Sequence, residues 1–546
     1  MEKCQNILSK SVSERKIDRQ MERFLNGLKE LDNFTETENG AVALKSTGNR
    51  VLDAFGTLGA MRNRDEEDII RIFDKAFNED SRLAMRLLFY IRDIRGGQGE
   101  RRTFRVIVKH LAEKHPILLL KNLDNFLFYG RGDDVLCLLD TPISMDVIQW
   151  IGDVLEGDII TVEDHNAYPT MLAKWLPSEN ASSLESKRYA RMIAKGLNWT
   201  PRHCRKILSQ LRNKIGIVET LMSQNKWEDI NFDTLPSRAA MIYSDAFMTH
   251  VQDNYIEYLK SSANGTSKIN ARTLYPYDIA HRILHKNVSL KDTYLLEAMW
   301  KALPNYFEDT EETGMCVVDT SASMHGQPME VAYSLGMYCA DKAKGPFHNH
   351  FITFSKNPTL QEIVGDNIVE KFKSMDLNIC ENTNIEKVFD LILRTALINN
   401  LKQEELPSKL YIISDMQWDE CVYDNSSKEK EYWGDNYNLK PETFISTMRK
   451  RFALYGYNLP AIVYWNVRTS DCGMFQQGSD EDNCCMVSGF SPSLFKSVIN
   501  GTEFVEEEVV TETGEIKVIE KQNINPMTVM LNTLNNERYD RVVTYE

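Results

Sequence analysis

The stretch "MCVVDTSASMHGQPMEVAYSLGMYCADKA", residues 315–343, decides the fold of the C-terminal half. It begins with four apolar residues, which is typical of a short, fully buried strand. An acid and a run of small, mostly hydroxylated residues follow, and a helical run then begins near Pro328. The stretch therefore predicts a strand–loop–helix unit with Asp319 at the carboxyl end of the strand, where open α/β sheets place their sites.

The same alternation continues to about residue 500. Short apolar runs predict further strands at 350–355, 360–364, 409–414, 461–467 and 485–489. Helical spacing between them predicts helices at 384–397, 441–455 and 491–499. Short buried strands separated by helices are typical of a mostly parallel, doubly wound sheet that carries helices on both faces.

The first 310 residues have a different pattern, with helix after helix and few strands. Helices are predicted at 81–94, 100–115, 186–197, 200–222 and 292–303. Paired helices with short glycine or proline breaks favour a solenoid, although no sequence period is evident. The acidic, turn-rich segment 305–314 separates this helical half from the α/β half, so the predicted fold class is multidomain α + α/β.

Composition limits the function. The net charge is −15, but residues 1–310 hold 43 basic and 43 acidic residues, so all of the excess lies beyond them. This distribution argues against indiscriminate nucleic-acid binding and leaves room for a local basic face. No apolar run approaches the roughly 20 residues of a membrane span. The polar N-terminus and scattered cysteines predict a cytoplasmic protein without membrane contact.

Oxygen-bearing side chains follow two predicted strands and open one predicted helix. Asp319, Ser321 and Ser323 are spaced i, i+2, i+4, Asp415 follows the strand at 409–414, and Thr383 lies in the loop before the helix at 384–397. Carboxylate and hydroxyl oxygens suit Mg²⁺ or Mn²⁺. The set resembles the metal-ion-dependent adhesion site (MIDAS) of von Willebrand factor A domains. The resemblance implies direct binding by the hydroxyls, binding by the aspartates largely through water, and an open position for a partner's carboxylate.

Two other interpretations of this loop remain open. It could be a turn that caps a helix and binds nothing. Alternatively, Asp319 could be the nucleophile of a metal-dependent phosphohydrolase. Such enzymes typically carry a second acid two residues later, where this chain has Ser321. We therefore expect a noncatalytic protein, with phosphohydrolase activity as the less favoured alternative.

Four segments of the helical half resemble TROVE-module proteins, the Ro autoantigen family, and more closely an uncharacterised relative of that family. They are "ENGAVALKSTGNRVLDAFGTLGAMR" (38–62), "FYIRDIRGGQGERRTFR" (89–105), "LFYGRGDD" (127–134) and "KINARTLYPYDIAHRIL" (268–284). The resemblance implies a ring of HEAT-like helical pairs, closed by the A domain, that binds small structured RNAs and single-stranded RNA ends. Together with the changes in sequence pattern, it predicts an N-terminal helical extension (1–37), a TROVE-like module (38–304), a linker (305–314) and an A domain (315–502). The tail (503–546) lies outside the resemblance, and its own pattern predicts a β-hairpin that turns at Thr513 and Gly514, followed by a closing helix.

Basic residues that could contact RNA phosphates form two groups. They are Arg202, Arg205, Lys206, Arg212 and Lys214 in one helical region, and Arg101 and Arg102 beside a glycine-rich break. No aromatic platform for base stacking is evident from the sequence. We expect an RNA-binding scaffold of a ribonucleoprotein. The alternative is a metal-dependent protein–protein adaptor that binds no RNA.

Overall fold

The computed structural model describes most of the chain. It covers residues 28–545 apart from 30–31, 164–167, 264–265, 268, 272–273, 309, 311–312, 355–356, 376–383, 420–443, 470–473 and 511–515. A helical N-terminal region is followed by a six-stranded, mostly parallel sheet in the C-terminal part. One continuous apolar core extends through both. Within the described residues, no helix has the length and apolar character needed to cross a membrane.

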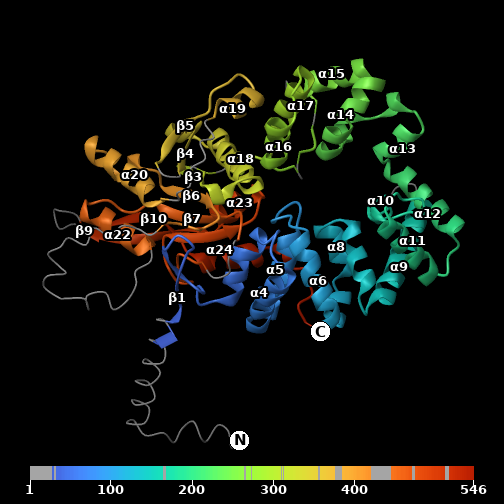
Figure 1. The fold of residues 1–546 in the computed structure, drawn as a ribbon, viewed down its shortest axis with the longest axis horizontal. Helices are drawn as coiled ribbons and strands as arrows, with labels where there is room; N and C mark the ends of the chain where they lie inside the picture. The colour runs from blue at the N-terminus through green and yellow to red at the C-terminus, as the bar shows by residue number, and fades with distance from the viewer. Residues whose placement is uncertain are drawn as a thin grey trace, which may run out of the picture.

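The helical region forms an arc, drawn from blue to green in Figure 1. Its helices are α3 (Arg50–Thr57), α4 (Glu66–Glu79), α5 (Ser81–Arg92), α6 (Arg102–Lys114), α7 (Pro116–Leu120), α8 (Leu123–Tyr129), α9 (Ser144–Glu163), α10 (Leu172–Trp175), α11 (Leu184–Gly196), α12 (Pro201–Ile215), α13 (Val218–Ser223), α14 (Ser237–His250), α15 (Gln252–Ala263), α16 (Pro276–His285) and α17 (Leu290–Lys301). A 3-10 segment, η2 (Gly132–Asp140), links α8 to α9.

Local chemistry sets the ends of these helices. Helix α12 begins where the sequence predicts, because the Thr200 side chain accepts a hydrogen bond from the His203 amide and Pro201 occupies the first helical position. It ends at Gly216, which adopts a left-handed conformation with φ of 72°. Helix α5 begins in the same way, with the Asp80 side chain accepting from the Leu83 amide.

The sheet has the strand order β5–β4–β3–β6–β7–β8. Its strands are β3 (Gly314–Asp319), β4 (His350–Phe354), β5 (Thr359–Glu362), β6 (Lys409–Ser414), β7 (Ala461–Asn466) and β8 (Cys484–Ser488). All neighbours are parallel except β4 and β5. Strand β5 lies at the edge of the sheet. It is antiparallel to β4 because the short connection between these two strands permits only a hairpin. The strand order reverses between β3 and β6, so polar side chains at the carboxyl ends of these two strands face a common crevice.

Helices surround the sheet (Figure 1). They are α18 (Gln327–Lys342), α19 (Ile368–Ser374), α20 (Glu386–Ile398), α22 (Phe444–Leu454), α23 (Ser493–Asn500) and α24 (Pro526–Leu534). Helix α18 packs closely on β3, where a β-carbon added at Gly336 would lie 2.6 Å from the Val318 side chain. Two further strands, β9 (Thr502–Val510) and β10 (Ile516–Ile524), form the hairpin that the sequence predicts; its predicted turn at Thr513 and Gly514 lies outside the described residues.

Both ends of the helical arc contact the sheet region. At one end, α16 and α17 pack on α18 and α19. At the other end, α3 packs on β8, and α24 returns from the C-terminus to pack on α3 and α5. The predicted closing helix is shorter than its sequence pattern, since it ends at Leu534 and a 3-10 turn, η9 (Glu537–Tyr539), follows.

The start of the described chain differs in part from the predicted helical extension over 1–37, since residues 28, 29 and 32 are helical but the residues after them are not. Residues Phe34–Glu36 form a strand, β1, that pairs antiparallel with β2 (Val42–Leu44). Residues 1–27 lie outside the described part. The hairpin places residues 37–40 beside the loop after β6, where Gly40 forms a bridge with Asp419. The pair of strands β1 and β2 therefore belongs to the contact between the two halves of the molecule.

Candidate metal centre and basic cavity

Asp319 is the last residue of β3, and its side chain is fully buried. One carboxylate oxygen accepts a hydrogen bond from the Ser321 amide at 2.9 Å, and the other accepts from the Ser414 hydroxyl at 2.6 Å. The Ser321 and Ser323 hydroxyls lie 3.1 Å apart. The loop after β3 therefore gathers one carboxylate and two hydroxyls, and the end of the adjacent strand β6 supplies a third hydroxyl that holds the carboxylate.

Asp415 follows β6 directly and is also buried. One of its carboxylate oxygens accepts a hydrogen bond from the Gln417 amide at 3.2 Å. The other, Oδ2, is buried and has no hydrogen-bond partner among the described residues. Buried carboxylate oxygens are usually hydrogen-bonded, so this atom is a candidate ligand for a cation.

Ionisation of these two carboxyls is opposed by their surroundings. Burial raises the pKa of Asp319 to about 7, and the charge of Asp415 adds to the shift. Burial also raises the pKa of Asp415, against the opposing effects of the Ser323 hydroxyl and the Gln417 amide. Two acids that disfavour each other's charge would both be relieved by a divalent cation.

The donor set fits a hard divalent cation. Asp319, Ser321, Ser323 and Asp415 supply oxygen atoms only, which suit Mg²⁺ or Mn²⁺ and not a thiophilic metal. The fifth predicted ligand, Thr383, lies outside the described residues. The structure thus brings together the carboxyl ends of β3 and β6, which contribute four of the five predicted residues.

Two neighbouring segments hold the loops of this centre. The Arg468 guanidinium donates a hydrogen bond to the Ser323 carbonyl. From the N-terminal hairpin, the Thr37 hydroxyl donates to the Trp418 carbonyl at 2.6 Å, and the Glu38 amide donates to the Gln417 side chain at 2.9 Å. The loop that carries Asp415 is therefore fixed by residues almost 380 positions earlier in the chain.

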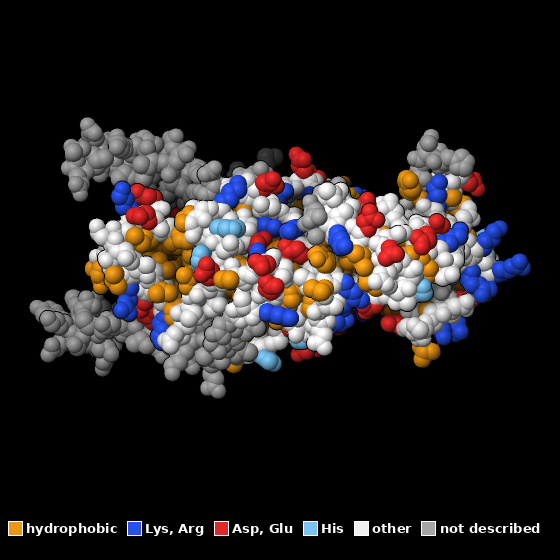
Figure 2. All heavy atoms as spheres, turned by 90° about the horizontal axis from the view of Figure 1, so that it is seen from above, with side chains coloured by type: hydrophobic (Ala, Val, Ile, Leu, Met, Phe, Trp, Pro, Cys, Tyr) orange, Lys and Arg blue, Asp and Glu red, His pale blue; other side chains and the backbone are white. Residues whose placement is uncertain are grey.

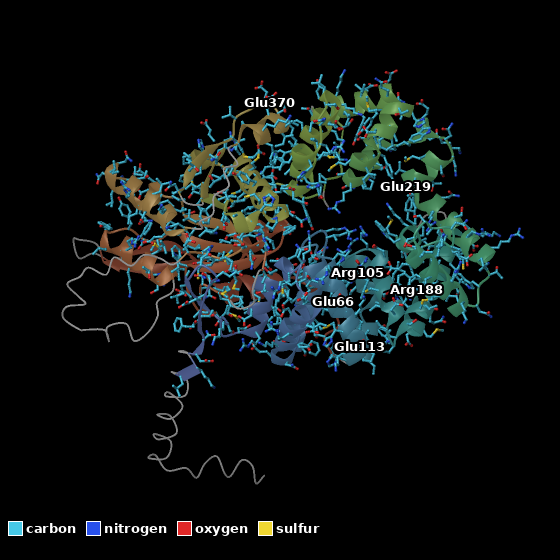
Figure 3. The ribbon with its side chains drawn as sticks, viewed as in Figure 1. Glu66, Arg105, Glu113, Arg188, Glu219 and Glu370 are labelled. Carbon is cyan, nitrogen blue, oxygen red and sulfur yellow. The ribbon has the colours of Figure 1, made fainter. Side chains whose placement is uncertain are left out.

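A large cavity of about 1910 Å³ lies within the helical arc. Its wall is formed by the ends of α5 and α8, by α10, α12, α13 and α14, and by parts of the sheet region. Figure 3 shows side chains projecting from the helices of the arc. Glu219, which is labelled there, lies on α13 and lines the cavity. Three acids line the cavity (Glu100, Glu219 and Asp233) against nine basic residues: Arg62, Arg92, Arg95, Arg101, Arg102, Arg131, Lys174, Arg212 and Arg238.

The cavity cations differ in how strongly they are neutralised. Five form ion pairs with carboxylates: Arg62, Arg92, Arg101, Arg131 and Arg238. Within the described chain, four form none: Arg95, Arg102, Lys174 and Arg212. Three of these four donate hydrogen bonds to backbone carbonyls, which orient the side chains and leave their charge uncompensated. Burial and the nearby Arg105 and Arg131 lower the pKa of Arg101, as expected in a region of positive potential.

The predicted RNA-contacting residues separate into two places. Arg101, Arg102 and Arg212 line the cavity. The remaining four do not line it: Arg202, Arg205, Lys206 and Lys214. The first three of these are exposed on α12, and Lys214 is half-buried. Figure 2 shows Lys and Arg side chains gathered at the end of the molecule farthest from the sheet, where Figure 1 places α11 and α12.

Sequence reasoning missed the aromatic component of the cavity. Trp175 lines the wall, with the Arg131 guanidinium 4.2 Å and the Lys174 ammonium 5.4 Å from its ring. Tyr275 and Tyr277 also line the cavity. The only sequence signal was the adjacent pair Lys174 and Trp175, since single-strand binders combine basic side chains with aromatic faces.

Comparisons with known proteins divide the chain at the same place as its fold. Residues 37–130 and 168–313 match a domain of unknown function (DUF2828), and residues 313–534 match a second domain of unknown function (DUF7788). The division at residue 313 falls within the predicted linker 305–314. The chain is similar to "Uncharacterized protein L728" of Acanthamoeba polyphaga mimivirus, with 31% identity over 539 residues that cover 92% of this chain and 91% of the mimivirus protein.

Proposed function

The chain belongs to the same family as the mimivirus protein L728, and we propose that it is a noncatalytic scaffold that binds RNA in its basic cavity. The observation that carries the proposal is the lining of that cavity, in which basic residues outnumber acids by nine to three. The volume of about 1910 Å³ exceeds the roughly 300–1,000 Å³ of small-molecule sites, so the cavity suits a polymer. Phosphates are the polyanion that such a lining attracts.

Single-stranded RNA fits the lining better than a duplex. The Arg131 guanidinium lies over the Trp175 ring, and both planar groups are of the kind on which bases stack, which requires that the base is unpaired. Arg95, Lys174 and Arg212 carry charge that no carboxylate in the described chain neutralises. The resemblance to the Ro family supports the same interpretation, with a HEAT-like ring closed by an A-like domain.

Filter binding of the full chain tests this proposal. The probe is a short RNA hairpin with a single-stranded 3′ tail, titrated at several salt concentrations between about 50 and 200 mM. We expect binding to weaken with salt, and the double variant Arg95→Glu/Lys174→Glu to reduce both the affinity and the salt slope. Trp175→Ala should lower the affinity for the tailed hairpin by about 1–3 kcal/mol and leave the affinity for a blunt duplex unchanged.

The matched control is Arg202→Glu/Arg205→Glu, which reverses two charges on the exposed face of α12. We expect it to retain most of the affinity, because these residues lie outside the cavity lining. Loss of binding in the control, with binding retained in the cavity variant, would show that RNA binds at the exposed face of α12 and not in the cavity. Absence of salt-dependent binding in the unaltered protein would refute RNA binding altogether.

A second function rests on the carboxyl ends of β3 and β6. The Asp415 oxygen that lacks a partner among the described residues and the raised pKa of Asp319 support a Mg²⁺ or Mn²⁺ site of the von Willebrand A type. When bound, the ion would supply an open coordination position that favours an anionic oxygen. We propose that this site recognises a protein partner that offers a carboxylate, independently of the RNA cavity.

Metal-dependent capture tests the second function. Proteins retained on the immobilised chain in Mg²⁺ should be released by EDTA and absent with Asp319→Ala or Thr383→Ala. Retention that persists in EDTA would contradict a metal-mediated contact. Phosphohydrolase chemistry is less favoured, because Asp319 is fully buried and both of its carboxylate oxygens accept hydrogen bonds, whereas a nucleophile must reach a substrate.

A further inference from the structure

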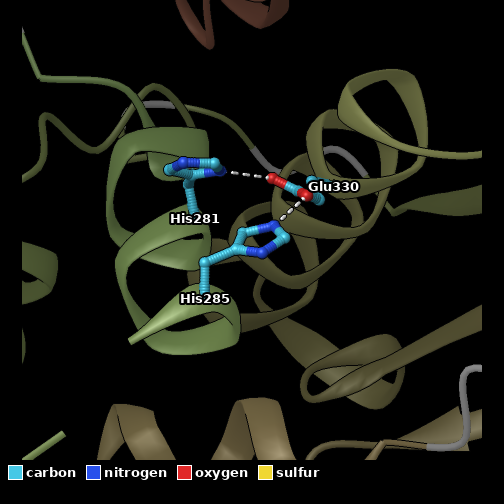
Figure 4. Close-up of side chains that lie close together, drawn as sticks. All are labelled: His281, His285 and Glu330. Atoms are coloured by element: carbon cyan, nitrogen blue, oxygen red, sulfur yellow. Dashed lines mark hydrogen bonds and ion pairs between the residues drawn. The ribbon is translucent and has the colours of Figure 1, made fainter. Parts of the chain in front are cut away.

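Three metal-ligating side chains converge where the helical arc meets the sheet region. His281 and His285 lie four residues apart on α16, so they project from the same face of the helix. Glu330 lies in the first turn of α18 and points toward both imidazoles (Figure 4). His281 Nδ1 is 2.8 Å from one carboxylate oxygen of Glu330, and His285 Nε2 is 2.5 Å from the other.

The geometry is close to that of a bound ion. One ligand atom from each of the three side chains lies within 4.8 Å of the others. In a tetrahedral zinc site with ligand bonds of about 2.0–2.1 Å, neighbouring ligand atoms are about 3.3 Å apart. The two nitrogen–oxygen distances would open by less than about 1 Å to admit the ion. Small rotations of side chains at the surface provide such a movement.

The donor set selects the class of ion. Two imidazole nitrogens and one carboxylate oxygen suit Zn²⁺ and similar borderline transition metals, whereas Mg²⁺ prefers oxygen ligands alone. The imidazoles are more than half exposed, at 53% and 54%, while the Glu330 carboxylate is mostly covered, at 13%. An ion placed here would therefore keep a fourth coordination position open to solvent. Glu330 would bind the ion from the buried side.

The position of the three residues gives the ion a structural role. Helix α16 belongs to the helical arc and α18 to the sheet region, and the two helices pack against each other. The Gln327 side chain adds a 3.1 Å hydrogen bond to the Tyr277 hydroxyl across the same contact. We propose that His281, His285 and Glu330 bind a Zn²⁺-class ion that joins the arc to the sheet region, separately from the oxygen-only centre at Asp319.

Zinc titration of the full chain, after removal of bound metal with EDTA and dialysis, tests this assignment. Calorimetry should detect a Zn²⁺ site that the double variant His281→Ala/His285→Ala lacks, and Glu330→Gln should weaken it by at least about 100-fold. Co²⁺ substituted at the site should give the visible absorption of a tetrahedral complex, which these variants lose. Zn²⁺ should also raise the Tm of the unaltered protein and leave the Tm of Glu330→Gln unchanged.

Two control variants show whether zinc binds at these three residues or at another histidine or acid of the chain. His110→Ala removes an imidazole that is also bonded to a carboxylate, Asp74 at 2.8 Å, so we expect it to bind Zn²⁺ as the unaltered protein does. Asp319→Asn should likewise keep the Zn²⁺ site while it loses any response to Mg²⁺. Zinc binding of equal strength in Glu330→Gln, or no zinc site in the unaltered protein, would overturn the proposal whatever the outcome of the RNA experiments.

Discussion

At the scale of single residues, Asp319 and Asp415 show what sequence can and cannot reveal. Each acid directly follows a short apolar run, so its place at a strand end could be predicted. The Ser414 hydroxyl that bonds Asp319, and the buried oxygen of Asp415 that lacks a partner within the described chain, could not. Both depend on the distance between two strands that lie almost 100 residues apart in the chain.

The raised pKa of Asp319 predicts a dependence of stability on pH. Between the ordinary value of 3.8 and about 7, the folded protein holds a proton that the unfolded chain has released. The free energy of unfolding of the metal-free protein should therefore fall as pH rises through this window. Asp319→Asn removes this titration, so between pH 4 and 8 the free energy of unfolding of the variant should fall less than that of the metal-free protein, by about 1.4 kcal/mol per pKa unit.

Urea unfolding from pH 4 to 8, with and without Mg²⁺, measures this effect. Mg²⁺ should stabilise the unaltered protein increasingly as pH rises, and it should have no effect on Asp319→Asn. Asp245→Asn serves as the control, since this exposed acid pairs with Lys291 and should leave the Mg²⁺ response intact. If the stability of Asp319→Asn fell with pH as steeply as that of the unaltered protein without metal, Asp319 would not be the titrating group and the proposed repulsion between the acids would be wrong.

At the scale of elements, strands were easier to predict than contacts between helices. The bounds of β6 match the strand predicted at 409–414, because its central residues 410–413 are apolar, as is typical of a strand that is buried on both faces. The contact of α3 with β8 had no comparable signal. It depends on Gly56 in α3 and on Gly59 in the 3-10 turn (Leu58–Ala60) that follows, where an added β-carbon would lie 2.1 Å from the Met486 side chain and 2.5 Å from the Ser488 carbonyl, respectively.

Gly59→Ala should therefore weaken the junction between the helical region and the sheet. The new methyl group would collide with backbone that cannot rotate away, so we expect a loss of about 1–3 kcal/mol in the free energy of unfolding. Gly157→Ala in α9 is the matched control, because no atom of the described chain lies within 4 Å of its β-carbon position. It should be neutral or stabilising by up to about 1 kcal/mol. Equal effects of the two substitutions on the free energy of unfolding would show that the close approach at Gly59 does not determine the stability of this junction.

At the scale of the whole molecule, the order of a helical region and a sheet region could be predicted, and the family resemblance implied a ring closed by the A domain, but the side chains that make the closing contacts could not be predicted. The C-terminal segment returns to the glycine-rich break after α5, where Arg538 bonds the fully buried Asp93 with one nitrogen at 2.7 Å. These partners are 445 positions apart. Tyr539 stacks on Tyr129 and donates a hydrogen bond to the same carboxylate at 3.1 Å. Periodicity along the chain carries no information about such a pairing.

Arg538→Ala should open this junction and leave the other one closed. Removing the arginine leaves Asp93 buried without its cation, a change that typically destabilises by about 3–5 kcal/mol. Hydrogen exchange should then accelerate in α5 and η9, whereas α16 and α18, which meet at the opposite end of the arc, should keep their protection. Arg541→Ala is the control. Arg541 donates a hydrogen bond to the neutral Asn125 side chain, so its removal leaves no buried carboxylate without a cation. Uniform acceleration across all helices would instead show that the arc and the sheet unfold as one cooperative unit, with neither junction able to open alone.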